Sequence, residues 1–143
     1  ITDKQAESLA RVKGYLELNG LTSINDEQAE SLSNNQYVQL TGLTSITDAQ
    51  AESLSKLDYP VLNGLTSITD EQAERLAKVK GYLELNGLTT ITDEQAASLS
   101  KVESLSLSGL TTITDEQAKS LSKIQYLTIS GVCQELVDQY KKP

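Results

Sequence analysis

The residues that could recognise a ligand recur at a fixed spacing along this chain. Five tyrosines lie 22 or 23 residues apart, or at twice that spacing: Tyr15, Tyr37, Tyr59, Tyr82 and Tyr126. Ser104 takes the one place where the column lacks a ring. A second column, two residues further on, varies in side-chain type: Glu17, Gln39, Val61, Glu84, Ser106 and Thr128. Aromatic rings one strand apart can pack against each other and still offer a gripping surface.

We therefore predict a binding surface for a protein, peptide or glycan. Its predicted residues are the five tyrosines with Glu17, Gln39, Glu84, Ser106 and Thr128. A tyrosine ladder that only stabilises the sheet explains the same column equally well. A third column, which precedes glycine and includes Asn19, Asn63 and Asn86, is typical of turns.

Residue types argue against catalysis. The chain has no histidine, and its one cysteine, Cys133, lies near the C-terminus. Glu17 and Glu84 belong to strands expected to be about 14 Å apart, beyond the roughly 5–9.5 Å that paired-carboxylate chemistry needs. No glycine-rich phosphate loop or metal-ligand cluster is present in the sequence. We expect no enzyme activity, no cofactor and no metal.

Composition narrows the partners further. A net charge of −8 disfavours nucleic acid and anionic membranes. No apolar run is long enough to cross a bilayer. Abundant Ser and Thr on an acidic chain favour a secreted or cell-surface location. The chain starts at Ile1 without methionine, which suggests a processed product or a fragment.

The columns arise because the chain is built from six copies of one unit. Each copy opens with a variant of Ile-Thr-Asp-Glu-Gln-Ala-Glu-Ser-Leu. The predicted repeats are 1–23, 24–45, 46–67, 68–90, 91–112 and 113–132, and residues 133–143 form a predicted C-terminal helical cap. A unit this short cannot bury its own apolar face, so the copies must stack into a solenoid with one continuous core.

The first repeat shows the elements that a unit contains. Thr2 and Gln5 form the Thr-x-x-Gln capping box, and Asp3 stands where the helix dipole favours an anion. A helix of about two turns should follow. Residues 15–19 alternate polar and apolar, which predicts a strand. Parallel strands joined by helical crossovers result. The invariant Asp and Gln columns read as helix caps.

The pattern breaks at a few positions. Asn35 replaces a core residue, which suggests a loosened edge or a local hydrogen bond, and Pro60 predicts an irregular strand. Residues 132–140 read as an amphipathic capping helix that buries Cys133. No comparable cap precedes Ile1, so the N-terminal end should expose apolar core.

The spacing Leu99-x-x-Val102-x-x-Leu105-x-Leu107-x-x-Leu110 resembles the leucine-rich repeat. The resemblance covers nearly the whole chain. The sequence of the repeats is similar to that of leucine-rich proteins from environmental bacteria such as planctomycetes. It implies a short α/β horseshoe with a parallel sheet on the concave face and helices on the convex face. Leucine replaces the family's usual asparagine, so Thr-Ser or Thr-Thr pairs such as Thr22-Ser23 should satisfy the backbone instead.

The preferred function is a non-catalytic binding module that uses the concave strand face, since such horseshoes mostly bind proteins. One alternative is a structural protein whose uncapped N-terminal end assembles head to tail with further copies. Another is a repeat fragment of a larger protein whose activity lies elsewhere.

Overall fold

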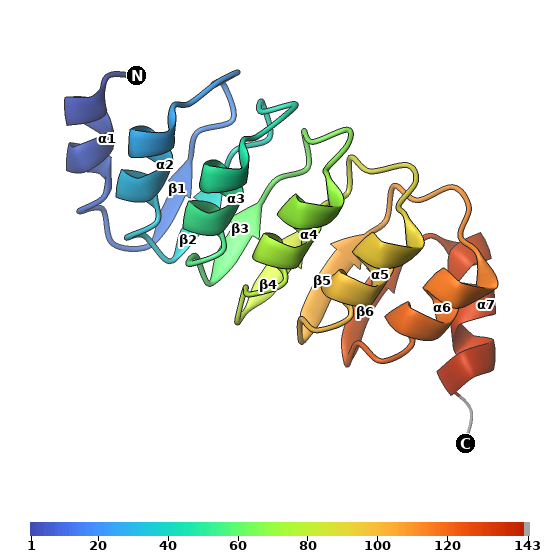
Figure 1. Ribbon diagram of the computed structural model, residues 1–143. Coiled ribbons are helices and arrows are strands. Elements are labelled where there is room, and N and C mark those ends of the chain that lie inside the picture. The colour runs from blue at the N-terminus through green and yellow to red at the C-terminus, as the bar shows by residue number, and fades with distance from the viewer. Residues whose placement is uncertain (142–143) are drawn as a thin grey trace.

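The computed structural model describes residues 1–141 as an α/β repeat solenoid, which confirms the predicted fold class (Figure 1). Six parallel strands form one sheet in the order β1-β2-β3-β4-β5-β6 and alternate with short helices. The strands are β1 Tyr15–Glu17, β2 Tyr37–Gln39, β3 Tyr59–Val61, β4 Tyr82–Glu84, β5 Ser104–Leu107 and β6 Tyr126–Ile129. The helices are α1 Asp3–Leu9, α2 Asp26–Leu32, α3 Asp48–Leu54, α4 Asp70–Leu76, α5 Asp93–Leu99, α6 Asp115–Leu121 and α7 Gly131–Lys141.

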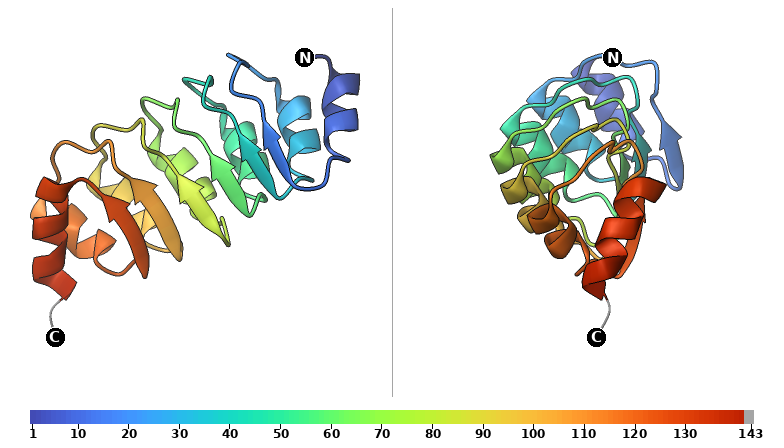
Figure 2. Two further views of the ribbon diagram at one scale, coloured as in Figure 1. Left: turned by 180° about the vertical axis from the view of Figure 1, so that it is seen from behind. Right: turned by 90° about the vertical axis from the view of Figure 1, so that its right-hand side faces the viewer.

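The repeats stack in single file, with the helices on one side and the sheet on the other (Figure 2). Strands of three or four residues are shorter than the five predicted at residues 15–19. The first strand ends at Glu17, after which Leu18 makes one more ladder bond to the Gln39 carbonyl before the turn.

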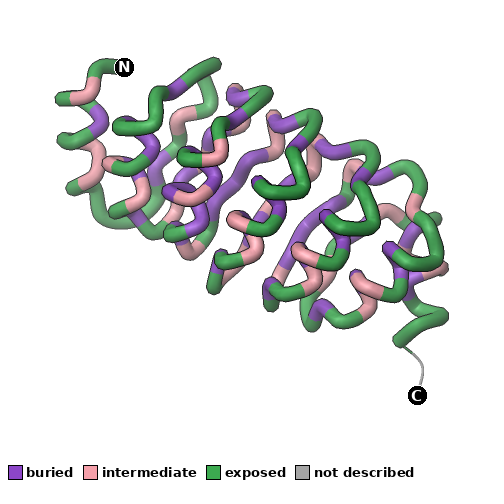
Figure 3. The backbone as a smooth tube through the Cα atoms, viewed as in Figure 1, coloured by how far each residue is buried: buried purple, intermediate pink, exposed green. Residues whose placement is uncertain are grey.

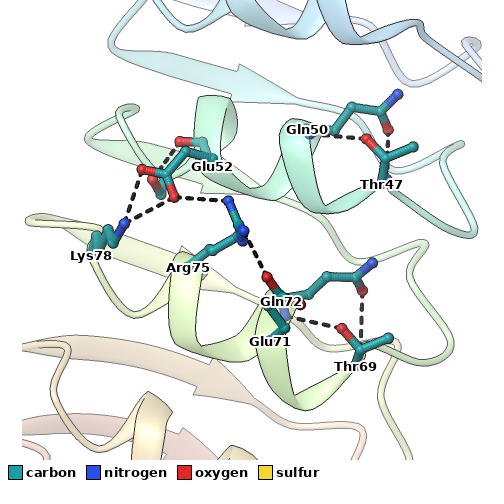
Figure 4. Close-up of polar contacts among 9 residues, drawn as sticks. Thr47, Gln50, Glu52, Thr69, Glu71, Gln72, Arg75 and Lys78 are labelled. Carbon is teal, nitrogen blue, oxygen red and sulfur yellow. Dashed lines mark hydrogen bonds and ion pairs between the residues drawn. The ribbon is translucent and has the colours of Figure 1, made fainter.

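Each of the six short helices begins with a capping box. In α4, Gln72 N–H donates to the Thr69 hydroxyl at 3.0 Å, and Thr69 N–H donates back to Gln72 Oε1 at 3.1 Å. Figure 4 shows this pair beside the equivalent Thr47 and Gln50. Only α2 changes the cap residue, to Asn25. The sequence prediction for Thr2 and Gln5 is confirmed.

The same glutamines also tie each repeat to the one before it. Gln50 Nε2 donates to the Ile24 carbonyl at 2.8 Å, and Gln72 Nε2 to the Ile46 carbonyl at 2.8 Å. We call the full set the glutamine ladder: Gln28, Gln50, Gln72, Gln95 and Gln117. All five are buried. Since the Oε1 of each accepts its own N-cap amide, one side chain fixes both a helix start and a repeat junction.

The apolar core runs unbroken between helices and sheet (Figure 3). A typical layer takes a leucine from a helix, such as Leu76, and an aliphatic side chain from a strand, such as Leu83, both fully buried. Burial of one such side chain contributes about 1.5–3 kcal/mol. Stacking therefore supplies the stability that a single unit lacks.

Pro60 makes the sheet locally irregular, as predicted, by shortening the ladder between β3 and β4. Leu62, two residues later, donates its N–H to the Glu84 carbonyl of β4. Alternation along a strand points the nitrogen of Pro60 toward β4 as well, where proline has no hydrogen to donate. The β3–β4 ladder accordingly pairs Val61 with Glu84 alone, whereas β2 and β3 pair over three residues.

Asn35 is the other irregular position, and it makes a local hydrogen bond between repeats. Its side chain is buried, and Nδ2 donates to the carbonyls of Leu9 at 3.1 Å and Val12 at 2.9 Å. Leu9 is the last residue of α1, and its carbonyl also accepts the Val12 N–H at 3.0 Å, while Val12 lies three residues beyond the helix. The last carbonyls of a helix lack intrahelical partners and are satisfied in this way by groups from outside it. The amide thus caps the preceding helix from the next repeat.

The C-terminal end of the stack is covered by α7, which begins at Gly131 and packs beside α6 (Figure 1). Cys133 and Val137 of this helix are buried in the core. Residues 142–143 of the predicted cap lie outside the described residues. At the other end, Ile1 is 42% exposed and Val12 is 40% exposed.

Removal of a ladder glutamine should cost far more than removal of its exposed equivalent. Gln72→Ala leaves the Ile46 carbonyl and the Thr69 amide without partners at a buried junction, which we expect to cost about 2–3 kcal/mol. Gln5→Ala removes only an exposed capping bond and should cost about 0.5–1 kcal/mol. Urea unfolding followed by circular dichroism measures both, and equal losses would refute the ladder.

Candidate functional site

The candidate site lies on the sheet face, by which we mean the side of the six strands turned away from α1 to α6 (Figure 2). Side chains alternate across a strand, so Leu16 and Leu83 point into the core while the tyrosines before them point outward. The parallel register places Tyr37 beside both Tyr15 and Tyr59.

Three rings form a contiguous cluster, which we call the tyrosine triad: Tyr15, Tyr37 and Tyr59. The rings of Tyr15 and Tyr37 meet edge to face, with centroids 4.6 Å apart and planes at 87°. Tyr37 and Tyr59 are 6.4 Å apart at 41°. Tyr15 is 78% exposed and Tyr59 is 47% exposed, while Tyr37 is half-buried between them. The triad thus presents two open rings braced by a third.

The other two tyrosines stand apart from the triad. Tyr82 pairs in register with Ser104, and Ser104 with Tyr126, so one strand separates their rings. Strands β3 and β4 pair at one residue only, beside Pro60. In the described part of the chain no ring pair joins Tyr59 to Tyr82. The aromatic column is therefore a triad followed by two isolated rings.

The second predicted column splits by accessibility. Glu17 and Thr128 are exposed, and Gln39 and Glu84 are half-buried. Ser106 is only 2% exposed and donates its hydroxyl to Asn86 Oδ1 at 2.6 Å. Burial removes Ser106 from the surface that a ligand can reach, although its strand position faces outward.

Asparagines before the turn glycines hold this column in place. Asn63 Nδ2 donates to Glu84 Oε2 at 2.9 Å, and Asn63 Oδ1 accepts from the Asn86 amide at 2.9 Å. Asn19 holds Gln39 in the same way, Nδ2 to Oε1 at 3.0 Å. The prediction of a purely local turn role missed these bonds, which orient the polar side chains of the next repeat.

One of the Thr-Ser and Thr-Thr pairs makes a side-chain bond to the backbone of the preceding repeat. The Thr111 hydroxyl donates to the Thr89 carbonyl at 3.3 Å, beside a backbone bond from the Thr111 N–H to the same carbonyl at 3.0 Å. The asparagines one position before glycine do comparable work on the sheet side.

A second polar cluster lies on the helix side, at the junction of α3 and α4 (Figure 4). Glu52 accepts from Lys78 Nζ at 2.9 Å and lies 3.5 Å from Arg75 Nη1, while Arg75 also pairs with Glu71 at 2.7 Å. The hydrogen bond from Lys78 lowers the pKa of Glu52, and the bond from Arg75 lowers the pKa of Glu71. The pairs of Glu52 join repeats 3 and 4 at a solvent-exposed surface, and the Arg75–Glu71 pair lies within α4.

Within residues 1–141, no three acidic or cysteine side chains gather closely enough to hold a metal ion. The helices of that same stretch include none with the length and apolar character of a membrane span.

Coupling between tyrosines should follow the ring contacts. A double-mutant cycle with Tyr15→Leu and Tyr37→Leu should give a coupling energy of about 0.5–1.5 kcal/mol, because the two rings meet edge to face. The same cycle with Tyr82→Leu and Tyr126→Leu should give none, because Ser104 lies between them. Thermal unfolding reads out both, and similar coupling in the two cycles would contradict the triad.

Stability should respond to acid through Glu52. Its folded pKa lies below the ordinary value of 4.5, so ionised Glu52 stabilises the fold above that value, and the contribution disappears as the pH falls through the folded pKa. Glu52→Gln should cost under about 1 kcal/mol at pH 7, because the pair is largely exposed, and nothing in strong acid. Urea unfolding from neutral to acid pH tests this. Glu30→Gln, at the same place in repeat 2, is the control, and a cost at Glu52 that persists in strong acid would contradict the assignment.

Comparison with protein families, curated proteins and solved structures finds no match to this chain.

Proposed function

We propose that the chain is a non-catalytic recognition module of the leucine-rich-repeat type, which binds an extended protein segment across its sheet face. The observation that carries the proposal is the tyrosine triad, two open rings braced by a third on adjacent strands. Tyrosine is the residue that recognition surfaces use most readily, because it offers a large amphipathic contact at low entropic cost.

The triad suits binding because its rings are already ordered. Edge-to-face packing against Tyr37 restricts Tyr15, so less side-chain entropy is lost when a partner docks. A ladder that served stability alone would bury its rings, yet Tyr15 and Tyr59 leave much of theirs open to solvent.

Charge indicates the kind of segment. The chain carries −8, and the sheet face adds Glu17 and Glu84 to the polar column beside the tyrosines. A partner with Lys or Arg side chains would meet both carboxylates and could place a cation over a tyrosine ring. We therefore favour a basic peptide or protein segment over an acidic one.

Assembly of copies from end to end has less support. A head-to-tail contact needs the C-terminal side of repeat 6, where α7 buries Cys133 and Val137. Such a contact would have to displace that helix and expose its core residues. A longer protein that contains these repeats is compatible with recognition by the sheet face.

The test is selection from a random peptide library against the immobilised chain. Enriched peptides should be rich in Lys and Arg, and their affinity should fall at least about tenfold on Tyr15→Ser/Tyr59→Ser. Both rings are exposed, so this variant should keep its fold by circular dichroism. Tyr126→Ser is the matched control, because its ring lies outside the triad and its exposure falls between those of Tyr59 and Tyr15; it should leave binding unchanged. Peptides that bind the double variant as tightly as the parent would refute the proposal.

A further inference from the structure

Two repeats with nearly the same sequence have very different surroundings. Repeat 1 (1–23) and repeat 4 (68–90) differ at four of 23 positions, namely 4, 8, 11 and 23 of the chain and their counterparts. Repeat 4 is covered by repeat 3 on its N-terminal side, while nothing within residues 1–141 covers repeat 1 there (Figure 1). Repeat 4 therefore shows what the open face of repeat 1 is shaped to accept.

Burial differs at the same side chains. Val12 is 40% exposed, whereas its counterpart Val79 is 3% exposed. Ile1 is 42% exposed against 9% for Ile68. We call the open surface the N-terminal face and define it by Ile1, Gln5, Leu9, Arg11, Val12, Gly14, Tyr15 and Gly20.

The main chain of repeat 3 approaches repeat 4 closely at two glycines, and the counterparts of these glycines lie in the N-terminal face. A Cβ at Gly87 would lie 2.3 Å from the Asn63 carbonyl oxygen, and one at Gly81 would lie 2.2 Å from the Asp58 carbonyl oxygen. Their counterparts Gly20 and Gly14 have no neighbour within 4 Å of such a Cβ. Gly14 has a positive φ of 103°, which by itself favours glycine, so Gly20 is the stronger observation of the two. Only glycine admits a main-chain carbonyl at such a distance.

Hydrogen-bond donors repeat this pattern. Gln72 Nε2 donates to the Ile46 carbonyl and Tyr82 N–H donates to the Asp58 carbonyl, each at 2.8 Å. In repeat 1 the matching donors, the Gln5 side-chain amide and the Tyr15 N–H, find no such carbonyl within residues 1–141. Arg11 takes the place of Lys78, which pairs with Glu52 of repeat 3.

We propose that the N-terminal face is an interface for a further helix-strand repeat with the surface chemistry of repeat 3. Such a unit presents main-chain carbonyls to Gln5 and Tyr15, sets carbonyls over Gly14 and Gly20, and places a carboxylate opposite Arg11. Leu9 and Val12 then become core residues. This interface lies at the end of the stack and shares Tyr15 with the tyrosine triad: the interface uses the Tyr15 N–H, and the sheet face uses its ring. The proposal does not depend on the function proposed for the sheet face.

A second copy of this chain does not supply that surface. Its own C-terminal side is covered by α7, with Val137 fully buried. Two copies that met by their N-terminal faces would each bring the donors of Gln5 and Tyr15 and not the carbonyls that repeat 3 supplies to repeat 4. The occupant is instead a repeat whose C-terminal side is open, as repeat 3 is toward repeat 4.

The test adds a copy of residues 46–67 directly ahead of Ile1, so that Ser67 joins Ile1 as it naturally joins Ile68. Docking should slow hydrogen exchange of the Tyr15 amide at least about tenfold and raise the urea midpoint of the extended chain. An added repeat that leaves the exchange of Tyr15 unchanged overturns the proposal.

Gly20→Ala is the diagnostic variant. In the 143-residue chain it should be silent, because nothing lies near the added Cβ. In the extended chain it should abolish the protection of Tyr15, as Gly87→Ala should destabilise the parent chain by steric overlap with the Asn63 carbonyl. Equal effects of Gly20→Ala in both chains would overturn the proposal.

Light scattering over a wide concentration range assigns the occupant. A constant mass near 15.5 kDa for the unextended chain is expected. A mass that grows with concentration, and that a charge at Leu9 abolishes, would assign the N-terminal face to a second copy and overturn the proposal.

Discussion

The glutamine ladder is the constraint on which the rest of the structure depends. A two-turn helix has little stability alone, and a three-residue strand has none. The buried side chain of Gln72 stabilises the helix and the repeat junction together. Its Oε1 accepts the N-cap amide at the start of its own helix, and its Nε2 donates to the Ile46 carbonyl of the preceding repeat. Because every junction repeats this geometry, the helices share one spacing. The strands behind them fall into register, and the outward column of tyrosines follows from that register.

Aspartates add a second tie beside the ladder. The Thr47 hydroxyl donates to Asp26 Oδ1 of the previous repeat at 2.7 Å, and Thr92 reaches Asp70 in the same way. One N-cap hydroxyl thus accepts from its own helix and donates across the junction. Polar groups that the sequence presents as local helix caps therefore also bind one repeat to the next. Asn25, the one change in the N-cap column, keeps this bond, because its Nδ2 donates to Asp3 Oδ1.

Period and alternation were enough to predict the fold class, because a repeated unit must stack and a two-residue alternation must form strands. The capping box of Thr2 and Gln5 was equally readable. The bond from Gln72 Nε2 to Ile46 was not, since residues 26 positions apart reveal no contact until the helix phase is known. The site was harder still. Five equally spaced tyrosines predict one stripe, yet Pro60 and Ser104 leave only Tyr15, Tyr37 and Tyr59 in contact. Burial of Ser106 likewise depends on how Asn86 turns, which no spacing encodes.

Pro60 also makes the junction between repeats 3 and 4 differ from the others. The sheet there rests on one residue pair and a few flanking bonds, and the helix side compensates with the ion pairs of Glu52, which weaken in salt. This junction falls just before repeat 4, whose sequence nearly restarts that of repeat 1. The sequence thus reads as two three-repeat blocks, and they meet at the junction where the strand ladder is shortest and ion pairs cross on the helix side. The surface that the second block buries at this junction is nearly the one that the first block shows at its own N-terminal end.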